Sequence, residues 1–492
     1  MKKVAFLIII VWVMTAIQGC KNQEDIIVTT ERYAMTEAVY VSEVKLQEAF
    51  WFIDGIAIVR IDDKFGYIDN TGKIIIEPVF NTAAQFSEGL AAVEMDVKWG
   101  YIDKTGDVII QPQFDEGHSF VEGWARVKVD KYYGVIDSSG TFIVAAKYDQ
   151  IFPSFDGFIS LRKEEQYGLF NIEERILIEP LYEEIGGFVE GLASVKKDGW
   201  GFINKSGKIV IDTRFEMISS FSEGFAAVAV MTEGERKYGY IDKTGEFVIE
   251  PKFDRAGDFI EGYSIVTEEE KWLVIDKRGE VVKYLEINDV IDMSHQFKQV
   301  EVEGRYGFID NKGNSIIEPR FDMSYSTFNF KEGIITLRLD EKWGYGNIEG
   351  KIIVEPQFDD AMDFMNEYAG RVVLDGKCGY VNKNGEIIVE PQFDDVDFLM
   401  AEGIARVMLD ERYGLVNDKG ELIAAPKYEV IGGFIEGMSA VKLEEKWGFI
   451  NDTGEEVVEP QYDNARQFNE GFAPVNLDGE WYYIDKTGEV VF

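Results

Sequence analysis

The sequence predicts an all-β protein of tandem repeats, each about 34 residues long with three antiparallel strands, that form a β-solenoid-like array. Three observations predict this class. One short motif recurs along almost the whole chain, each copy contains three strand patterns, and no segment has a sustained helical period. Two propeller-like sub-arrays of six blades each are the alternative architecture, because arrays of six blades can close.

The recurring motif is an aromatic residue followed by glycine, as in Trp99-Gly100, and its copies lie 33 to 38 residues apart. Self-similarity at such a period predicts a repeat protein before any other architecture. Trp272-Leu273, Cys378-Gly379 and Trp481-Tyr482 keep the register but change the pair. The copies begin at Phe65, Trp99, Tyr133, Tyr167, Trp200, Tyr238, Trp272, Tyr306, Trp343, Cys378, Tyr413, Trp447 and Trp481.

Each repeat is expected to begin with a hairpin. In one copy, residues 99–103 are aromatic and β-branched, and residues 107–110 form a second run of this kind. The turn between them contains Gly106, which can adopt a left-handed conformation. Proline cannot donate to a strand ladder, so we expect it to close the second strand. Nine of the 11 prolines occupy this place, namely Pro78, Pro112, Pro180, Pro251, Pro319, Pro356, Pro391, Pro426 and Pro460.

A third strand is expected over residues 124–129. Ala125, Val127 and Val129 fall on one face, and Arg126 and Lys128 fall on the other. Such alternation is typical of a half-buried antiparallel strand. Residues 114–117, between the second and third strands, are expected to form a compact turn.

These motifs resemble the bacterial WG repeat. Residues 447–451, 460–463 and 468–475 follow the pattern of that family nearly throughout. The resemblance covers roughly nine-tenths of the chain. It implies β-rich repeats, often in secreted or envelope proteins, and it carries no established reaction and no catalytic residues.

A second, fainter resemblance lies at residues 479–488, which are similar to the β-hairpin repeats of choline- and cell-wall-binding modules. Those repeats stack into solenoids. The resemblance makes Trp481, Tyr482 and Tyr483 candidate ligand-binding residues.

The N-terminus is typical of a lipoprotein signal peptide. Lys2 and Lys3 precede an uncharged stretch that is too short to span a bilayer comfortably. Residues 17–20 resemble a lipobox, in which the signal peptide is removed before a lipidated cysteine, here Cys20. Lys21 follows where an aspartate would favour the inner membrane of Gram-negative bacteria, so we expect the outer membrane.

The predicted domain organisation follows from these features. Residues 1–19 are the signal peptide, 20–50 a lipidated tether and cap, 51–262 the first part of the array, and 301–492 the second part. Residues 263–300 form a degenerate repeat with Leu273 in place of glycine. Two interpretations of it stay open, a joint between two sub-arrays and sequence drift within one continuous array.

The formal net charge of −40 excludes several classes of partner. Nucleic acids and anionic lipid surfaces are normally neutralised by basic side chains, so we expect no nucleic-acid partner. An acidic surface favours solubility, and it favours basic partners or a loose cloud of divalent cations.

The sequence contains no recognisable catalytic constellation. His118 and His295 lie in non-equivalent places, and with the single further cysteine, Cys378, they cannot supply the clustered ligands of a zinc site. Cys378 stands in the aromatic place of its repeat, which indicates a small buried hydrophobic residue. We therefore expect no enzyme, no cofactor and no metal.

Two acidic groups keep a glycosidase pair or a calcium site open as alternatives. They are Asp359, Asp360 and Asp363 in one repeat, and Asp394, Asp395 and Asp397 in the next. Equivalent acids recur at the corner of most repeats, which favours solvated, turn-capping roles.

The sequence thus predicts a lipid-anchored envelope protein that acts as a non-catalytic protein-interaction scaffold. The alternative is a cell-wall or glycan-binding module. The expected partners are an envelope protein, or peptidoglycan or another glycan, and the membrane is reached through Cys20.

Overall fold

The structure is a computed structural model that describes residues 39–153, 157–291, 297–322, 333–364, 369–397 and 403–492. Within these ranges the chain is all-β, and the single 3₁₀ turn η1 (Val41–Glu43) is its only helical element. None of the described segments forms a helix long and apolar enough to cross a membrane. The chain divides into two compact units, one of Met1–Ala146, Asn469–Asp485 and Glu489–Phe492, the other of Lys147–Phe468 and Lys486–Gly488.

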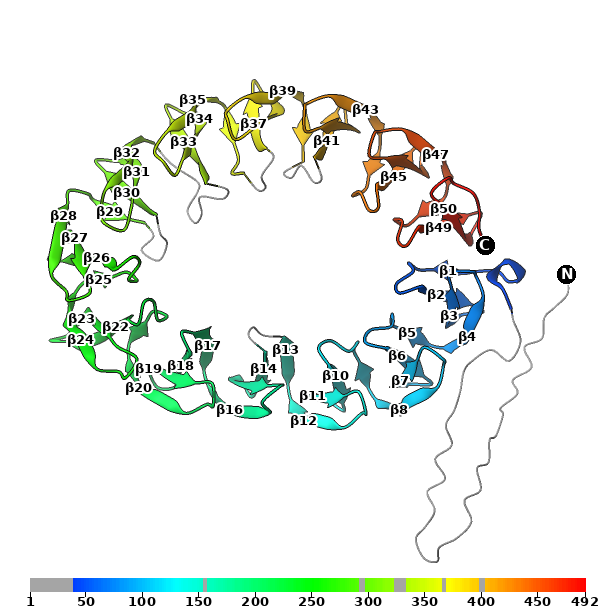
Figure 1. Ribbon diagram of the computed structural model, residues 1–492, viewed down its shortest axis with the longest axis horizontal. Helices are drawn as coiled ribbons and strands as arrows, with labels where there is room; N and C mark the ends of the chain where they lie inside the picture. The colour runs from blue at the N-terminus through cyan, green and yellow to red at the C-terminus, as the bar shows by residue number, and fades with distance from the viewer. Residues whose placement is uncertain (1–38, 154–156, 292–296, 323–332, 365–368, 398–402) are drawn as a thin grey trace, which may run out of the picture. The chain divides into compact units, whose positions relative to one another are not determined.

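The first unit contains the N-terminal sheets and the C-terminal hairpin (Figure 1). Strands of each sheet follow one another in space as they do in sequence. They are β1 (Glu48–Ala49), β2 (Ile56–Ile61), β3 (Lys64–Asp69) and β4 (Ile74–Phe80); β5 (Thr82–Ala83), β6 (Leu90–Met95), β7 (Lys98–Asp103) and β8 (Val108–Phe114); β9 (Glu116–Gly117), β10 (Trp124–Val129), β11 (Tyr132–Asp137) and β12 (Phe142–Tyr148); and the hairpin β49 (Phe472–Leu477) and β50 (Glu480–Asp485).

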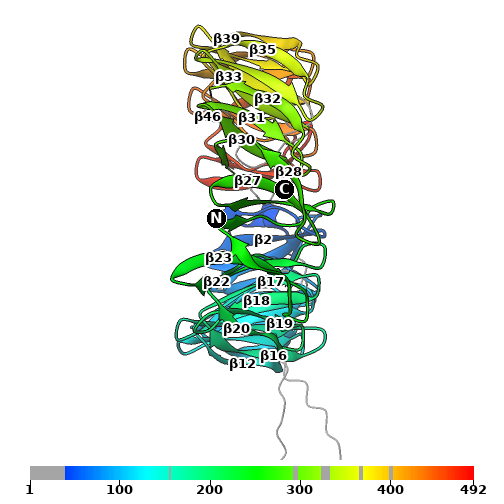
Figure 2. The ribbon, with the colours of Figure 1, turned by 90° about the vertical axis from the view of Figure 1, so that its left-hand side faces the viewer.

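The second unit repeats the same meander, and β30, β31 and β32 show it side by side in Figure 2. Its strands are β13 (Gln150–Pro153), β14 (Phe158–Lys163), β15 (Gln166–Asn171), β16 (Ile176–Tyr182); β17 (Glu184–Val189), β18 (Leu192–Lys196), β19 (Trp200–Asn204), β20 (Ile209–Phe215); β21 (Met217–Ile218), β22 (Ala226–Thr232), β23 (Glu235–Ile241), β24 (Phe247–Phe253); β25 (Arg255–Ala256), β26 (Tyr263–Glu268), β27 (Lys271–Asp276), β28 (Val281–Leu285); β29 (Asp289–Val290), β30 (Lys298–Val302), β31 (Arg305–Ile309), β32 (Ser315–Phe321); β33 (Ile334–Leu339), β34 (Lys342–Asn347), β35 (Ile352–Phe358); β36 (Asp360–Ala361), β37 (Gly370–Leu374), β38 (Lys377–Val381), β39 (Ile387–Phe393); β40 (Asp395–Val396), β41 (Ile404–Leu409), β42 (Arg412–Asn417), β43 (Leu422–Tyr428); and β44 (Val430–Ile431), β45 (Met438–Leu443), β46 (Lys446–Asn451), β47 (Glu456–Tyr462) and β48 (Asn464–Ala465).

Most sheets have four strands, and the expected three-stranded unit was wrong in this respect. The segment predicted as a compact turn at residues 114–117 contains the short strand β9, in which Glu116 pairs with Lys128 and Gly117 with Val127. Two residues are too few for periodicity to reveal a strand. Only pairing with a strand later in the chain defines it.

The solenoid expectation was also wrong. Strand pairing stays within each sheet, and neighbouring sheets contact each other through side chains, as the blades of a propeller do. Apolar residues cover both faces of a sheet, so sheets stack face to face instead of extending edge to edge. The propeller alternative fits in part, because the sheets resemble blades. However, the first sheet contacts the C-terminal hairpin instead of closing on a sixth blade.

The core lies between successive sheets. In the first unit, Tyr67 and Phe80 of one sheet pack against Ala91 and Ile102 of the next. Tyr101, on the opposite face from Ile102, packs in turn against the third sheet. The third strand of each sheet is therefore buried on both faces, whereas a strand covered on one face would alternate between buried and exposed residues.

Prolines lie inside the fourth strands and do not close them, which corrects another expectation. In β8, Trp99 pairs with Phe114 and Tyr101 with Ile110, so Gly100 alone faces the stretch that contains Pro112. This register shift is a β-bulge, which accommodates a residue that has no N–H to donate. The strand can thus continue past its proline.

Candidate functional site

Of the three predicted ligand-binding aromatic residues, Tyr483 is buried where the C-terminal hairpin meets residues 50–52. It lies in β50, and its side chain is 0% exposed. Its hydroxyl donates a hydrogen bond of 2.6 Å to the carbonyl oxygen of Phe50. The ring centroid lies 5.1 Å from that of Phe52 and 5.2 Å from that of Phe492. Tyr483 therefore offers no open ring face to a ligand.

Trp481 and Tyr482 are each partly exposed on the same strand. The backbone N–H of Trp481 donates to the carbonyl of Leu46 at 3.2 Å, which ties the hairpin to the N-terminal segment. The hydroxyl of Tyr482 donates to Oε2 of Glu480 at 2.8 Å. This hydrogen bond raises the pKa of Tyr482 and lowers the pKa of Glu480. The surface available for stacking at this place is thus limited to two partly covered rings.

The lipidation residue predicted from the sequence, Cys20, lies outside the described residues, as does the signal peptide at residues 1–19. His295 also lies outside them. Their roles stay predictions.

The acidic residues at the sheet corners make structural contacts. Asp359 binds Nζ of Lys342 at 2.5 Å through Oδ1, and its Oδ2 accepts the N–H of Asp375 at 2.6 Å. Asp394 repeats this arrangement with Lys377 and the N–H of Asp410. The hydrogen bonds from the two lysines hold the pKa of Asp359 and of Asp394 below the ordinary range. A general acid needs a raised pKa, so neither carboxyl suits that role.

The remaining residues of the two acidic groups are also engaged. Oδ1 of Asp360 accepts the N–H of Ala361 at 3.0 Å, and Asp363 accepts a hydrogen bond of 2.9 Å from the hydroxyl of Thr336. Oδ2 of Asp397 lies 2.7 Å from Nε of Arg406. Each carboxylate thus serves a local contact.

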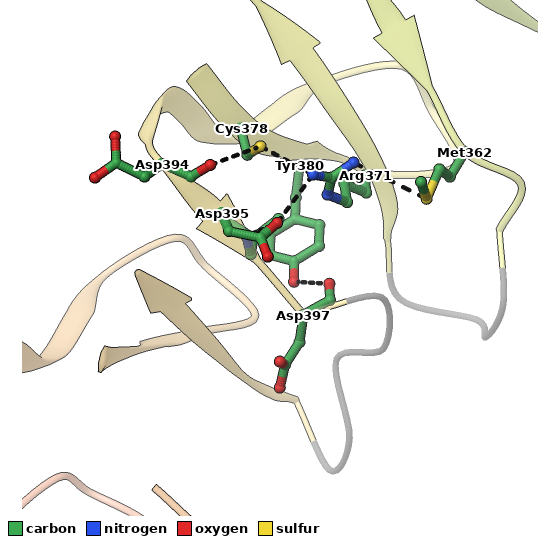
Figure 3. Close-up of polar contacts among 8 residues, drawn as sticks. Met362, Arg371, Cys378, Tyr380, Asp394, Asp395 and Asp397 are labelled. Atoms are coloured by element: carbon green, nitrogen blue, oxygen red, sulfur yellow. Dashed lines mark hydrogen bonds and ion pairs between the residues drawn. The ribbon is translucent and has the colours of Figure 1, made fainter. Parts of the chain in front are cut away.

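Cys378 lies beside a guanidinium group and a carboxylate (Figure 3). Nη2 of Arg371 lies 3.1 Å from its sulfur and 2.9 Å from Oδ1 of Asp395. The thiol is 3% exposed, so the expectation of a small buried residue is confirmed. Burial raises the pKa of this thiol, which keeps it protonated. A protonated, covered thiol is a packing residue and not a nucleophile.

His118 contacts a cation. Its Nε2 lies 3.1 Å from Nη2 of Arg126. Burial and this neighbour lower the pKa of the imidazole, so it is neutral at neutral pH. In the part of the chain that the structure describes, no three histidine, cysteine or acidic side chains are grouped so that they could hold a metal ion.

The most regular polar feature is a set of exposed acidic residues at the hairpins between the second and third strands. We call the first acidic residue of each hairpin an acidic tip. Most of these connections are two residues long, such as Asp62-Asp63 between Ile61 and Lys64. The acidic tips are Asp62, Asp96, Asp130, Glu164, Asp198, Glu233, Glu269, Glu303, Asp340, Asp375, Asp410, Glu444 and Asp478, all of them exposed and all with positive φ.

Positive φ is an unusual conformation for these residue types. Two-residue hairpins favour type I′ turns, for which Asn-Gly is the preferred pair. Yet Glu164 and Glu165 have φ of 49° and 66°, and Glu444 and Glu445 have φ of 50° and 65°. A side chain other than glycine, asparagine or aspartate is uncommon there. The glutamate tips thus stand at some conformational cost, whereas aspartate tolerates this conformation.

The acidic tips are not among the site residues predicted from the sequence. The signal was present, because an acidic residue directly follows the last residue of nearly every second strand, as Asp96 follows Met95; after β18, Lys197 comes between. In the sequence, lysines such as Lys98 lie close to the acidic residues, so that each of these segments resembles an ordinary turn with mixed charges. The structure separates the two kinds of charge, since Lys98 is paired with Asp115.

A family model described as WG containing repeat matches residues 65–99, 99–133, 133–166, 167–199, 200–230, 238–272, 306–343, 343–378, 379–413, 413–447 and 447–481. Among curated proteins, no match is found.

Solved structures give only remote similarities. The crystal structure of the eukaryotic initiation factor is 12% identical, with a TM-score of 0.30, and the match covers 62% of this chain and 96% of that one. The crystal structure of the tricorn protease is 10% identical, with a TM-score of 0.19, and the match covers 91% and 62% of the two chains. At these TM-scores neither similarity bears on the fold or the function of this chain.

Proposed function

Because this chain belongs to the family of WG-containing repeat proteins, we propose that it is a non-catalytic scaffold that binds other proteins in a bacterial cell envelope. Lipidation at Cys20 would hold it at the outer membrane. The stacked sheets then present equivalent surface residues at regular intervals, as extended repeat surfaces do.

The observation that carries this proposal is the series of acidic tips. Each unit presents them at equivalent places on successive sheets, and all are exposed. Glutamates held at positive φ, where asparagine or glycine would be more stable, indicate a surface whose charge matters more than its local stability. Such a surface suits a basic protein partner, and charge complementarity speeds association and sets specificity.

A cell-wall or glycan-binding module is the second candidate. It rests on Trp481 and Tyr482, which are partly exposed next to each other in sequence. Aromatic rings stack on sugar faces, but two partly covered rings offer little area. We therefore place this function second.

One experiment separates the two candidates. The full chain is co-sedimented with purified peptidoglycan sacculi across a salt series. A protein scaffold should not pellet at high salt, because screening removes loose charge attraction. Salt-resistant pelleting that is lost in Trp481→Ala would instead establish wall binding. The neighbouring exposed residue Leu477, changed to Ala, is the matched control.

A second experiment tests the acidic tips directly. At the hairpins of Glu164-Glu165, Glu269-Glu270 and Glu444-Glu445, the two acidic residues are replaced by Asn-Gly. The turn should keep its conformation and gain stability. Cross-linking to envelope proteins should fall, and its dependence on salt should weaken. Unchanged cross-linking in this variant would count against the tips as the binding surface.

The anchor is tested separately. Replacement of Cys20 by Ser should move the protein from the membrane fraction to the soluble fraction, because the lipid is attached to this thiol. A variant that stays with the membranes would show that another feature holds it there.

A further inference from the structure

The fourth strand of each four-stranded sheet is an edge strand, and three features protect most of these edges from pairing with other chains. The first is the register shift beside the aromatic-glycine pair, the second is proline within the strand, and the third is an acidic residue just before this proline. In β24 these are the shift between Tyr238 and Tyr240, then Pro251, then the exposed Glu250. The register shift occurs in β4, β8, β16, β20, β24, β32, β39, β43 and β47, and also in β35, the last strand of a three-stranded sheet.

Two of the edge strands, β12 and β20, lack proline but keep the glycine. In β12, a Cβ added to Gly134 would lie 2.8 Å from the carbonyl oxygen of Val144. In β20, Thr213 stands in the place of proline, and the shift between Trp200 and Phe202 remains. A close approach or a register shift at the glycine thus remains even where the proline is missing.

Strand β28 has lost all three features. Leu273 replaces the glycine, and no register shift occurs beside it. The three consecutive pairs are Trp272 with Leu285, Leu273 with Tyr284 and Val274 with Lys283. Leu285 stands where other repeats have proline, and Tyr284 stands where they have an acidic residue. From Lys283 to Leu285 the strand is therefore regular, and every residue retains its N–H.

Apart from Lys283, the exposed side chains of β28 are apolar or aromatic. Val282 is 53% exposed and Tyr284 is 66% exposed. Val282 lies at the one register shift that β28 keeps, between Val274 and Ile275, and the residues from Lys283 to Leu285 pair with β27 in unbroken register. The equivalent pair in β24 is Val248 and Glu250, where a carboxylate interrupts the apolar surface. β28 is the last strand of its sheet, and within the described ranges its outer edge pairs with no other strand.

A regular, exposed, apolar edge is a template for another extended segment. Main-chain hydrogen bonds give such pairing its affinity, and alternate side chains give it specificity. We propose that β28 is the docking strand for an extended segment of a partner protein, with alternating apolar residues and basic residues on both flanks. This inference rests on the proposed scaffold function and deepens it by naming the docking place and the chemistry of the partner.

The basic flanks follow from charge complementarity. Glu280 and Glu286 are exposed and directly flank the two ends of β28. The one basic residue within the strand, Lys283, donates to the carbonyl oxygen of Gly313, so its charge is held against the neighbouring sheet. An incoming segment thus meets a carboxylate at each end and apolar side chains between them.

The same charges disfavour a second copy of this chain as the occupant. Antiparallel pairing of two β28 strands about Lys283 would place Glu280 opposite Glu286 at both ends and Lys283 opposite itself. Like charges directly opposite destabilise a strand pair. Each copy also carries a net charge of −40.

The test uses the full chain and two synthetic peptides of alternating valine and threonine, one flanked by pairs of lysines and the other by pairs of glutamates. Binding is measured by calorimetry, and amide hydrogen exchange reports which strand is covered. We expect the lysine-flanked peptide to bind at least about tenfold more tightly than the glutamate-flanked one, and to slow exchange in β28. Binding without protection of the β28 amides would overturn the proposal.

Three variants sharpen the test. Tyr284→Glu restores the acid of the other repeats, and Leu273→Gly with Leu285→Pro restores their bulge. Both should weaken binding at least about tenfold, whereas Tyr284→Phe should leave it unchanged. Val248→Glu on β24 is the matched control, since Pro251 already protects that edge. Because Tyr284 is exposed, the melting temperature of Tyr284→Glu should equal that of the wild type. If this variant is folded and still binds the peptide with unaltered affinity, the proposal is overturned.

Other occupants give different results. Dimerisation seen by sedimentation velocity and lost in Tyr284→Glu would replace the partner with a second copy. If the peptide fails to bind and Tyr284→Glu still cross-links to the wild-type set of envelope proteins, the docking strand is wrong and the scaffold function stands. If the wild-type chain cross-links to no protein, the scaffold function itself fails.

Discussion

At the scale of single residues, the glycine of the aromatic-glycine pair is required by space. A Cβ added to Gly100 would lie 2.6 Å from the carbonyl oxygen of Ile110 and 2.9 Å from the nitrogen of Pro112. Both are backbone atoms, which cannot rotate away. The glycine and the proline of the repeat are thus two parts of one bulge, and repeats that keep the proline need the glycine opposite it.

Substitution of Gly100 by alanine should lower the free energy of unfolding by about 2–4 kcal/mol, since the backbone of β8 must shift to accept the methyl group. Urea denaturation followed by tryptophan fluorescence measures this. Gly433→Ala is the control, because a Cβ at Gly433 meets nothing within 4 Å. Equal midpoints for the two variants would show that the bulge accommodates a side chain.

A second contact between single residues is the ion pair of a lysine at the start of one strand with an aspartate after the next strand. Nζ of Lys98 lies 2.5 Å from Oδ1 of Asp115, whose Oδ2 accepts the N–H of Asp130 at 2.6 Å. The hydrogen bond from Lys98 holds the pKa of Asp115 below its usual value of 3.8. Asp359 and Asp394 repeat this contact.

These lowered pKa values predict how stability depends on pH. A carboxyl whose pKa is lower in the folded than in the unfolded state stabilises the fold fully above the unfolded pKa, and this stabilisation is lost as pH falls through the folded pKa. The melting temperature should therefore drop on acidification below about pH 4. In Asp115→Asn this drop should be smaller. A steeper drop in the variant would contradict the assignment.

At the scale of elements, glutamates in the turns just before the second strands of the sheets connect successive sheets. The carboxylate of Glu223, before β22, accepts the N–H groups of Glu261 and Gly262 at 2.7 and 2.9 Å, and it lies 3.1 Å from Nζ of Lys277. Burial raises the pKa of Glu223, but the hydrogen bonds from Lys277 and the two N–H groups outweigh it and lower the pKa. Each such turn holds the next sheet in place.

Replacement of Glu223 by Gln should therefore loosen the next turn without unfolding the sheets. The amide cannot accept from both N–H groups and bind the lysine as strongly as a carboxylate does. Hydrogen exchange at Glu261 and Gly262 should speed up, while exchange within β22 and β23 stays unchanged. Glu122→Gln is the control, because the Glu122 carboxylate contacts no backbone N–H among the described residues. Unchanged exchange at both of these amides in the Glu223 variant would rule out this connecting role.

At the scale of the whole molecule, the first described sheet and the C-terminal hairpin meet within the first unit (Figure 1). Phe52 packs against Phe472 and Tyr483, with centroid distances of 5.3 and 5.1 Å. Nδ2 of Asn469 donates to the carbonyl oxygen of Phe52 at 2.7 Å, and Lys45 pairs with Glu480 at 3.1 Å. The terminal sheets thus cover apolar faces that would otherwise meet water.

Replacement of Phe52 by Ala should lower the free energy of unfolding of the first unit by about 3–5 kcal/mol, because a fully buried ring is lost from this junction. Hydrogen exchange should speed up together in β2–β3 and in β49–β50. Val97→Ala, at a residue that is 76% exposed, should leave both unchanged. Faster exchange in only one of the two places would show that the ends do not depend on each other.

Much of this architecture could be predicted from local sequence. The repeat length, the β class and the hairpin around Gly106 follow from periodicity and turn chemistry, which act between near neighbours. The family resemblance is confirmed by the matches to its model. The anchor at Cys20, the divisions at residues 51–262, 263–300 and 301–492, and the expected partners stay predictions.

By itself, the sequence determined that this chain is a β-repeat protein, because each repeat contains its own turn and strand signals. Only the tertiary structure decided that the sheets stack face to face, that Pro112 lies inside a strand, and that Tyr483 is buried against Phe50 and Phe52. These features depend on which strands and faces meet. Such contacts join residues as far apart as 50 and 483, and a local pattern carries no information about its distant partner.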